Sequence, residues 1–271
     1  MSNLVFLFRN SQETEEEFEI LQKLYPDIVH ESRMSIPPNS LVVGRFSVLP
    51  FYKELENDLL LKNAKLINTY SQHLYVADLQ NWYQDLKDYT PKTWFTLAEY
   101  IADKYEGPVV LKGATNSRRE LWKTHMFANN KDEARQVYFR LMDDSLIKTQ
   151  NVYIRKYEPL VEYCKDVVGM PIVKEFRFFV FNQKIIAGGF YWSNYIEEAG
   201  NPMAEAEVPT GWLSDVIDKV GDQNNFYSID VAQKLNGEWM VVELNDGCMS
   251  GVNSIHPKNL YERIFEVSMG Q

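Results

Sequence analysis

The stretch that decides the fold reads Phe226-Tyr-Ser-Ile-Asp-Val-Ala-Gln-Lys-Leu-Asn-Gly-Glu-Trp-Met-Val-Val-Glu-Leu-Asn245. At its centre the dipeptide Asn236-Gly237 stands between two apolar runs, which is the strongest short-range signal for a β-hairpin with a two-residue type I′ turn. That turn places Asp230 directly opposite Glu243, and directly opposed residues share one face of a sheet. The same face is then predicted to hold three side chains with oxygen atoms: Asp230, Glu243 and Asn245.

Two carboxylates that oppose each other on a sheet repel unless a positive charge lies between them. Mg²⁺ prefers oxygen ligands and commonly takes one or two carboxylates together with substrate phosphates. We therefore predict a magnesium site on this face of the hairpin. The alternative is a solvated face, on which both carboxylates point to water. The alternating residues are predicted to point to the other face: Ile229, Val231, Val242 and Leu244.

A second hairpin is predicted around a turn at Asn182-Gln183. This turn places Arg177 opposite Gly188, which has no side chain, and puts Glu175 on the same face as Arg177. An arginine with free space beside it can reach a ligand, and its fork of donors suits two phosphate oxygens. The alternative is an ion pair of Arg177 with Glu175 or with a neighbouring strand.

A third candidate is the lysine that ends the buried strand Val109–Lys112, because a lysine at such a position can neutralise phosphates. The polar segment 113–127 follows at once and is predicted to be a long functional loop. The sequence has neither a Walker A motif nor Gly-x-Gly-x-x-Gly, so a P-loop or Rossmann nucleotide site has no support.

Residues 1–75 predict a small α/β unit that precedes these motifs. Leu4–Phe8 is a continuous apolar run, typical of a parallel strand covered on both faces. Thr14 and Glu17 have the spacing of a capping box at a helix start. Residues 76–87 predict one continuous helix. The remaining elements are predicted as strands at 41–43, 66–67 and 152–157 and helices at 51–62, 96–104, 131–142 and 212–220.

Composition excludes several classes of function. The chain has 271 residues and a formal net charge of −10, which argues against a general nucleic-acid binder. No stretch approaches about 18 consecutive apolar residues, so no membrane span is predicted, and the N-terminus has no basic leader. Two cysteines, Cys164 and Cys248, are too few for a disulfide framework, and the cytoplasm is the predicted location.

Taken in order, these features resemble the ATP-grasp superfamily over nearly the whole chain. Lys112 resembles the strand lysine that contacts the α- and β-phosphates of ATP, and residues 114–127 resemble the lid that closes over ATP. The strand 152–158 resembles the hinge whose backbone hydrogen-bonds adenine. Asp230, followed later by Glu-x-Asn, is similar to the magnesium ligands of the family. The resemblance is closest to a less-studied clade marked by extra arginines and a lysine.

The resemblance implies an α/β (α+β) architecture, an ATP-grasp fold preceded by a small α/β N-terminal domain. The N-terminal domain is expected at residues 1–75 and the ATP-grasp domain at 76–271. Within the latter, a lid subdomain is expected at about 92–155 and a C-terminal antiparallel-sheet subdomain at about 156–271.

The resemblance also implies which residues bind ATP. In the clade, the strand of Glu175 and Arg177 supplies an arginine near the γ-phosphate. The usual second phosphate-binding lysine is missing from residues 74–78, so basic lid residues are expected to replace it. Ribose is assigned to Glu162 by distance from the hinge or to Glu175 by its place on the next strand. The implied ATP-binding set is Lys112, Arg118, Arg119, Lys123, Arg155, Lys156, Tyr157, Glu158, Glu162, Glu175 and Arg177.

The implied activity is that of an ATP-dependent ligase that joins a carboxylate to an amine through an acyl phosphate and releases ADP and phosphate. ATP and two Mg²⁺ ions are the expected cofactors, with Lys112 and Arg177 as the catalytic residues. The alternatives are a kinase-like phosphotransferase and a non-catalytic module that binds nucleotide or peptide. The amine is left open among amino acid, peptide and protein, and a homodimer is expected. Further candidates for binding a substrate carboxylate are Arg9, Arg33 and Arg45.

Overall fold

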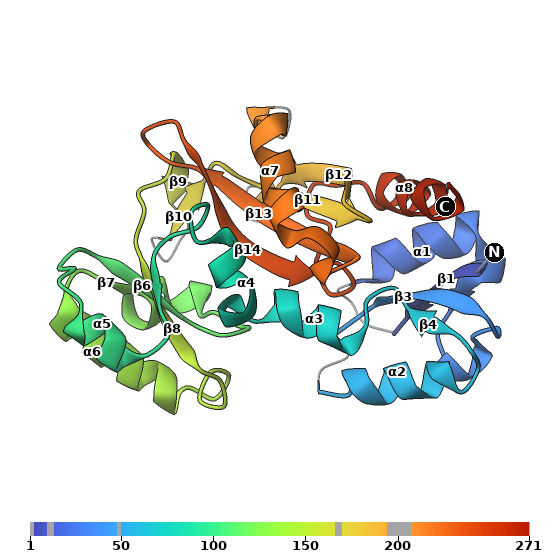
Figure 1. Cartoon of the computed structure of the whole chain (residues 1–271), viewed down its shortest axis with the longest axis horizontal. Helices are drawn as coiled ribbons and strands as arrows, with labels where there is room; N and C mark the ends of the chain where they lie inside the picture. The colour runs from blue at the N-terminus through green and yellow to red at the C-terminus, as the bar shows by residue number, and fades with distance from the viewer. Residues whose placement is uncertain (1–2, 10–13, 48–49, 166–169, 194–206, 271) are drawn as a thin grey trace.

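The computed structural model describes residues 3–9, 14–47, 50–165, 170–193 and 207–270. Within these residues the chain forms three four-stranded sheets and a two-stranded ribbon. Figure 1 shows an elongated molecule with the N-terminal sheet at one end, the sheet of β5–β8 at the other, and the sheet of β11–β14 between them. No helix in the described ranges is both long and apolar enough to cross a bilayer.

The N-terminal sheet is parallel throughout, in the order β2-β1-β3-β4, as the continuous apolar strand predicts. The predicted capping box does not form: the Thr14 side chain does not cap the helix, and Glu17 is buried against Arg45 instead. The elements are β1 (Asn3–Phe8), α1 (Glu15–Leu24), η2 (Pro26–Ile28), β2 (Val29–His30), η3 (Arg33–Ser35), β3 (Ser40–Arg45), α2 (Tyr52–Leu60) and β4 (Lys65–Leu66).

The connection to the rest of the chain contains two helices, α3 (Tyr70–Ala77) and α4 (Leu79–Leu86), where one was predicted. Asp78 interrupts them because its backbone is extended, with φ −118° and ψ 119°. Its side chain then accepts a hydrogen bond of 2.9 Å from the Gln80 N–H and caps α4.

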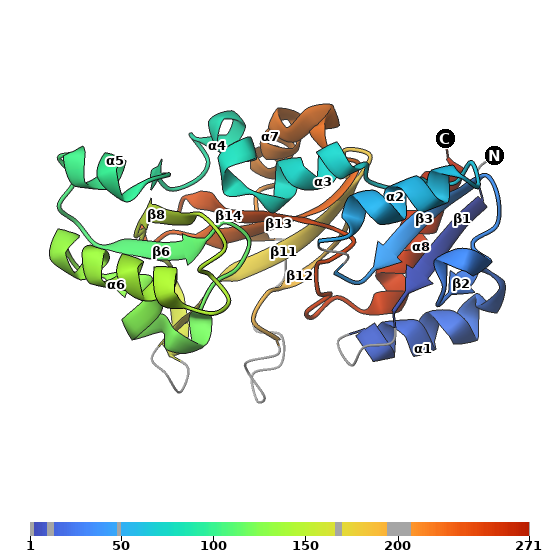
Figure 2. The ribbon, with the colours of Figure 1, turned by 90° about the horizontal axis from the view of Figure 1, so that it is seen from below.

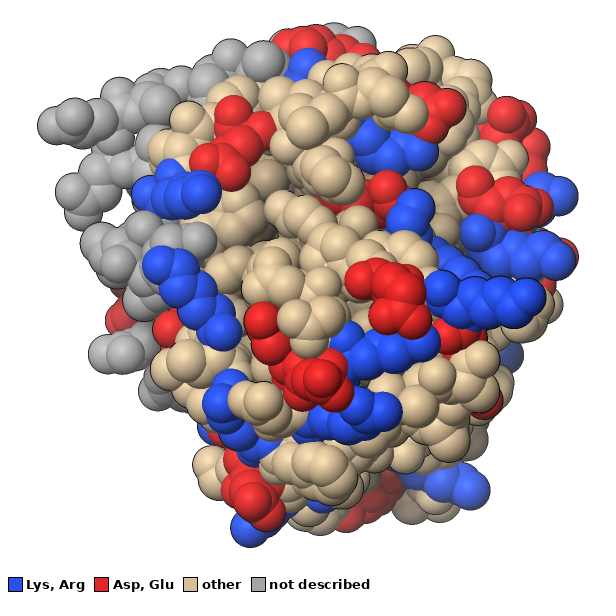
Figure 3. Space-filling view, turned by 90° about the vertical axis from the view of Figure 1, so that its left-hand side faces the viewer, with Lys and Arg blue, Asp and Glu red and all other residues tan. Residues whose placement is uncertain are grey.

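The sheet of the lid end has the order β5-β8-β6-β7 and is antiparallel. The segment 113–127, predicted as a loop, contains two short helical turns. The elements are β5 (Thr93–Trp94), α5 (Leu97–Ala102), β6 (Val109–Gly113), η4 (Arg119–Leu121), η5 (Trp122–Met126), β7 (Phe127–Ala128), α6 (Lys131–Asp143) and β8 (Val152–Lys156). Figure 3 shows positive and negative side chains interspersed over the described part of this face, unlike the single basic patch that nucleic acids need.

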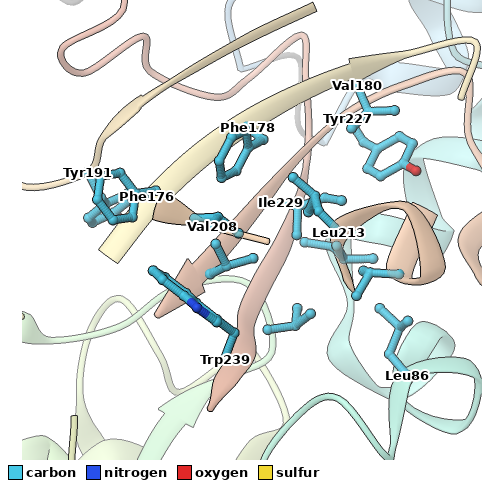
Figure 4. Packing of buried hydrophobic residues seen from close by; sticks show 14 of the residues in the cluster. Leu86, Phe176, Phe178, Val180, Tyr191, Val208, Leu213, Tyr227, Ile229 and Trp239 are labelled. Atoms are coloured by element: carbon cyan, nitrogen blue, oxygen red, sulfur yellow. The ribbon is translucent and has the colours of Figure 1, made fainter. Parts of the chain in front are cut away.

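The central sheet has the order β12-β11-β13-β14, and α3, α4 and α7 lie along one of its faces (Figure 2). Its apolar side chains meet those of the helices in a dry core, part of which is drawn in Figure 4. The elements are β9 (Glu162–Lys165) and β10 (Pro171–Val173) of the ribbon, β11 (Glu175–Phe181), β12 (Lys184–Phe190), α7 (Thr210–Val220), η8 (Gly221–Gln223), β13 (Phe226–Gln233) and β14 (Trp239–Asp246).

The β13–β14 hairpin has the predicted register at its functional end but a different turn. Asp230 lies opposite Glu243, as predicted. The tip is closed by the Lys234 N–H, which donates to Glu238 at 2.8 Å, and Gly237 has φ 88°, which is a three-residue loop ending in glycine. A bulge between Asp230 and Val231 restores the register. Because of the bulge, Val242 lines the same cavity as Glu243, so its predicted place on the opposite face is wrong.

The β11–β12 hairpin shows the converse. Its turn is the predicted one, and Asn182 and Gln183 have φ 48° and 60°, as type I′ requires. A bulge between Phe179 and Val180 then shifts the pairing, so Arg177 lies opposite Gly189, not Gly188. The space beside the glycine is also filled, since a Cβ on Gly189 would lie 2.5 Å from Ser254 Oγ.

The C-terminal helix α8 (Pro257–Met269) packs against α1 of the first sheet. Its residues Leu260 and Tyr261 share one core with Phe6 of β1 and with Phe179 and Phe226 of the central sheet. The N-terminal unit therefore completes its core with residues from the far end of the chain.

Candidate active site

A cavity of about 160 Å³ opens between the lid-end sheet and the central sheet. Strands β6, β8 and β14 supply most of its walls, and the segment after β8 closes one end. Its apolar lining includes Pro91, Val110, Trp122, Met126, Leu160, Met170, Val173, Met240 and Val242. The predicted residues that line it are Lys112, Arg119, Arg155, Lys156, Tyr157, Glu158, Glu175 and Glu243.

A polar recess of about 300 Å³ adjoins the apolar cavity. Lys112, Arg119 and Glu243 line both spaces. The lid segment contributes the remaining wall through Thr115, Asn116, Ser117 and Glu120. The site therefore has an apolar chamber of the kind that suits a flat base and a polar chamber with two cations.

Lys112 and Glu243 form a salt bridge across the cavity, although 131 positions separate them in sequence. Burial alone would raise the pKa of Glu243, but the positive charges of Lys112 and Arg119 bring it down to about 2. The Glu243 carboxylate is therefore ionised at neutral pH. The two sheets meet at this ion pair.

Arg177 binds Asp230 with both ends of its fork, at 2.7 Å from Nε to Oδ1 and 2.8 Å from Nη2 to Oδ2. Its Nη1 donates to the Gly251 carbonyl at 3.0 Å and to Asn253 Oδ1 at 3.2 Å. The ion pair predicted as the alternative thus exists, with Asp230 of the neighbouring strand as the partner rather than Glu175.

The three predicted magnesium ligands lie together at the start of the hairpin. Asp230 and Glu243 are paired in register, and Asn245 hydrogen-bonds to Glu243. Their carboxylates are neutralised here by Arg177 and Lys112. Within the described ranges, no group of three or more His, Cys, Asp and Glu side chains could hold a metal ion. Two carboxylates and one amide nevertheless provide the hard oxygen donors that suit Mg²⁺.

The segment after β8 has one backbone donor to spare. The Lys156 N–H donates to Lys92 O at 2.8 Å, and the Tyr157 N–H donates to Pro108 O at 3.0 Å. The Glu158 N–H has no acceptor among the described residues, which leaves it available to a ligand in the cavity. Of the predicted hinge, Glu158 is therefore the residue whose backbone can donate to a base.

The Arg155 side chain has a role that hinge resemblance did not predict. It is buried, and it donates to Val242 O at 2.7 Å and to Thr90 Oγ1 at 2.6 Å. Burial lowers the pKa of Arg155 to about 10, with Glu243 opposing the shift. Its guanidinium forms part of the cavity wall beside Glu243.

Three predicted ATP-binding residues lie outside this cavity. Arg118 is held within the lid by Asp144, with its Nε 2.8 Å from Oδ2. Lys123 and Glu162 line an adjacent pocket of about 380 Å³, which shares Trp122 and Tyr157 with the cavity. The geometry thus places Arg119, not Arg118 or Lys123, where a second phosphate-binding cation is needed.

Tyr191 is a central residue of the site that the sequence did not reveal. Burial raises the pKa of Tyr191 to about 12, so its hydroxyl stays neutral. The Arg119 Nη1 donates to this hydroxyl, and the Arg177 guanidinium lies 4.8 Å from the ring centroid. No local pattern marks Tyr191, since its role depends on two arginines from distant segments.

The N-terminal arginines are engaged in the protein itself. Arg33 pairs with Glu54 at 3.1 Å and Asp58 at 2.7 Å. Arg45 is buried and bonded to Glu17, so neither matches the expectation of a free carboxylate-binding arginine. Arg9 lines a small pocket at the end of β1, apart from the cavity.

Glu175 gives a pH-dependent prediction. Burial, followed by the charges of Asp230 and Glu243, raises its pKa to about 8, although Arg119 and Arg177 oppose this. An acid whose pKa is raised on folding loses stability as pH increases between its unfolded and folded pKa values. Glu175→Gln should therefore flatten the fall in melting temperature between about pH 5 and 8. Parallel pH profiles for both proteins test this, and superimposable profiles would contradict it.

Comparison with known proteins identifies the fold. The family model that matches residues 82–264 describes an ATP-grasp domain, family 3 of the clade named for two arginines and a lysine. No curated protein matches the chain in sequence.

Several solved structures share the fold at low identity. The RimK domain protein ATP-grasp from Sphaerobacter thermophilus DSM 20745 is 18% identical, with a TM-score of 0.58 over 98% of this chain and 100% of that one. D-cycloserine synthetase DcsG is 11% identical, with a TM-score of 0.62 over 98% and 99%. The ATP-grasp ligase PsnB, complexed with minimal precursor, Mg and ADP, is 11% identical, with a TM-score of 0.60 over 100% and 99%. The predicted fold is confirmed, and the chain belongs to the ATP-grasp domain proteins, in family 3 of the two-arginine, one-lysine clade.

Proposed function

We propose that this protein is an ATP-dependent ligase that joins a carboxylate to an amine through an acyl phosphate. The observation that carries the proposal is the two-chamber site, in which Lys112 and Arg119 of the lid end face Glu243 of the central sheet. The apolar chamber suits adenine, with the Glu158 N–H as a donor to the base. The polar chamber suits the phosphates.

Asp230, Glu243 and Asn245 would hold Mg²⁺, which when bound supplies positive charge to the phosphate oxygens. In the present structure Lys112 neutralises Glu243. Once the charge of Glu243 is balanced by a cation, the Lys112 ammonium is free to bind phosphate oxygens. The ion pair therefore keeps both residues in place before the nucleotide arrives.

The reaction needs little covalent chemistry from the protein, because positioning and charge neutralisation dominate phosphoryl transfer. A substrate carboxylate oxygen attacks the γ-phosphorus, and the bond to the β-phosphate oxygen breaks, which leaves ADP. The amine nitrogen then attacks the acyl carbon, loses a proton and expels phosphate. Arg119 and Arg177 would stabilise the transferring phosphoryl group. The lid segment would exclude water from the acyl phosphate.

The solved relatives support a ligase over a kinase-like enzyme. PsnB is an ATP-grasp ligase seen with a precursor peptide, and DcsG is a synthetase. These names suggest that the amine or carboxylate is carried by an amino acid or a peptide. The site itself does not choose between them.

Binding of nucleotide is the first test. A non-hydrolysable ATP analogue with Mg²⁺ should raise the melting temperature, because a ligand at a hundredfold its dissociation constant stabilises the fold by about 2.7 kcal/mol. The analogue without Mg²⁺ should produce a smaller shift. Absence of any shift at saturating ligand would contradict the proposal.

Product analysis distinguishes the reaction types. Amino acids and peptides should be screened for ADP release, and active pairs analysed for phosphate and free amine. A ligase releases one phosphate for each amine consumed. A phosphorylated product without loss of amine would show a phosphotransferase instead.

A further inference from the structure

Arg119 and Arg177 approach each other from different parts of the fold. Arg119 begins the turn η4 of the lid segment, whereas Arg177 lies in the middle of β11. Asp230 neutralises Arg177 at 2.7 Å, but within the described ranges no carboxylate lies within salt-bridge distance of Arg119. Two cations brought together in a partly buried site repel each other unless something between them compensates.

The group between them is Tyr191. The Arg119 guanidinium lies 5.1 Å from the centroid of its ring and the Arg177 guanidinium lies 4.8 Å from it. Arg119 also donates to the Tyr191 hydroxyl. The electron-rich ring attracts both cations, and such contacts strengthen where water is excluded.

Tyr191 is itself held firmly. Its N–H donates to the Glu175 carbonyl at 3.0 Å, and Asn253 donates to its carbonyl from a left-handed backbone with φ 52°. The same Asn253 accepts from Arg177 at 3.2 Å. The ring lies beside Phe176 at the edge of the central core (Figure 4). Its position is therefore set by the sheet and not by the lid.

We propose that Tyr191 is a positioning residue that fixes Arg119 of the lid beside Arg177 of the sheet, so that the two guanidiniums form one preformed site for the γ-phosphoryl group. This inference rests on the proposed function, since it assumes that the polar recess takes the phosphates. It predicts that Tyr191 contributes to selectivity for the γ-phosphate and not to binding of the nucleotide in general.

The test compares two nucleotides in calorimetric titrations with Mg²⁺: ADP, and a non-hydrolysable ATP analogue that keeps the γ-phosphate. The wild type should bind the analogue about tenfold or more tightly than ADP. Tyr191→Leu should remove about tenfold of this preference, and ADP affinity should change by less than about twofold. Tyr191→Phe keeps the ring but loses the hydrogen bond, and about a threefold loss is expected. Tyr191→Phe also serves if the leucine variant does not fold.

Two further variants show whether Tyr191 acts through Arg119. Arg119→Gln should reduce the preference as much as Tyr191→Leu, and the double variant should lose no more than either alone. Arg135→Gln, an exposed arginine of α6 paired with Asp132, is the matched control and should leave both affinities unchanged.

The outcomes separate the two proposals. If the wild type binds neither nucleotide, the proposed function fails and this inference fails with it. If it binds both equally, or if the folded Tyr191 variants keep the full preference, the proposed function stands and the role of Tyr191 is disproved. Additive losses in the double variant would also overturn it, because Tyr191 and Arg119 would then act independently.

Discussion

Glu243→Gln should abolish the Mg²⁺-dependent rise in melting temperature with nucleotide and lower any ligase turnover by about 10²–10³-fold. Glu243 is the carboxylate on which the two sheets converge, and Lys112 and Arg119 hold its pKa at about 2. Its charge is therefore present throughout the pH range of any assay. Removing that charge takes away one proposed ligand of the cation and leaves Lys112 without its partner.

The measurement is thermal melting with the ATP analogue, with and without Mg²⁺, followed by ADP release once a substrate pair is known. Glu238→Gln is the matched control, because Glu238 lies on the same hairpin and also pairs with a lysine, Lys234, but is exposed at the tip. The control should keep the full shift. A Glu243→Gln protein that retained the Mg²⁺-dependent shift would remove Glu243 from the cation site.

The two hairpins show how far sequence reasoning reaches. Pairing of Asp230 with Glu243 was predicted because glycine and asparagine mark a turn and side chains alternate on a strand. Both hairpins also contain a bulge, and a bulge adds one residue without a local sequence signal. In one hairpin the bulge compensated for a wrong turn, and in the other it moved Arg177 by one position. Local rules thus predicted the elements, while register depended on packing.

The candidate site follows the same division. Lys112 and Glu243 could be predicted because each ends or interrupts an apolar strand with a charge. Tyr191 and the side chain of Arg155 could not, because their roles arise from contacts between strands that only the folded chain brings together. The choice of Arg119 over Arg118 is also geometric: two adjacent arginines point to different partners, Tyr191 and Asp144.

The second large effect concerns stability. Glu17→Gln should lower the free energy of unfolding by about 3–5 kcal/mol, because it leaves the charge of Arg45 buried without its carboxylate. Both side chains are almost inaccessible, at 5% and 2% exposure, and the Arg45 Nη2 lies 2.8 Å from Glu17 Oε2. Urea denaturation measures the change. Glu16→Gln, at an exposed position in the same helical turn, is the control and should change stability by less than about 0.5 kcal/mol.

This ion pair also connects the N-terminal unit to the candidate site. Arg45 donates to the Gly247 carbonyl at 2.5 Å and to the Ser250 carbonyl at 2.9 Å, in the loop that follows β14. The next residue of that loop, Gly251, accepts from Arg177. Loss of Glu17 should therefore loosen the loop as well as the fold, and nucleotide should restore less stability to this variant than to the wild type. If Glu17→Gln is as harmless as Glu16→Gln, the two carbonyls alone compensate the charge of Arg45.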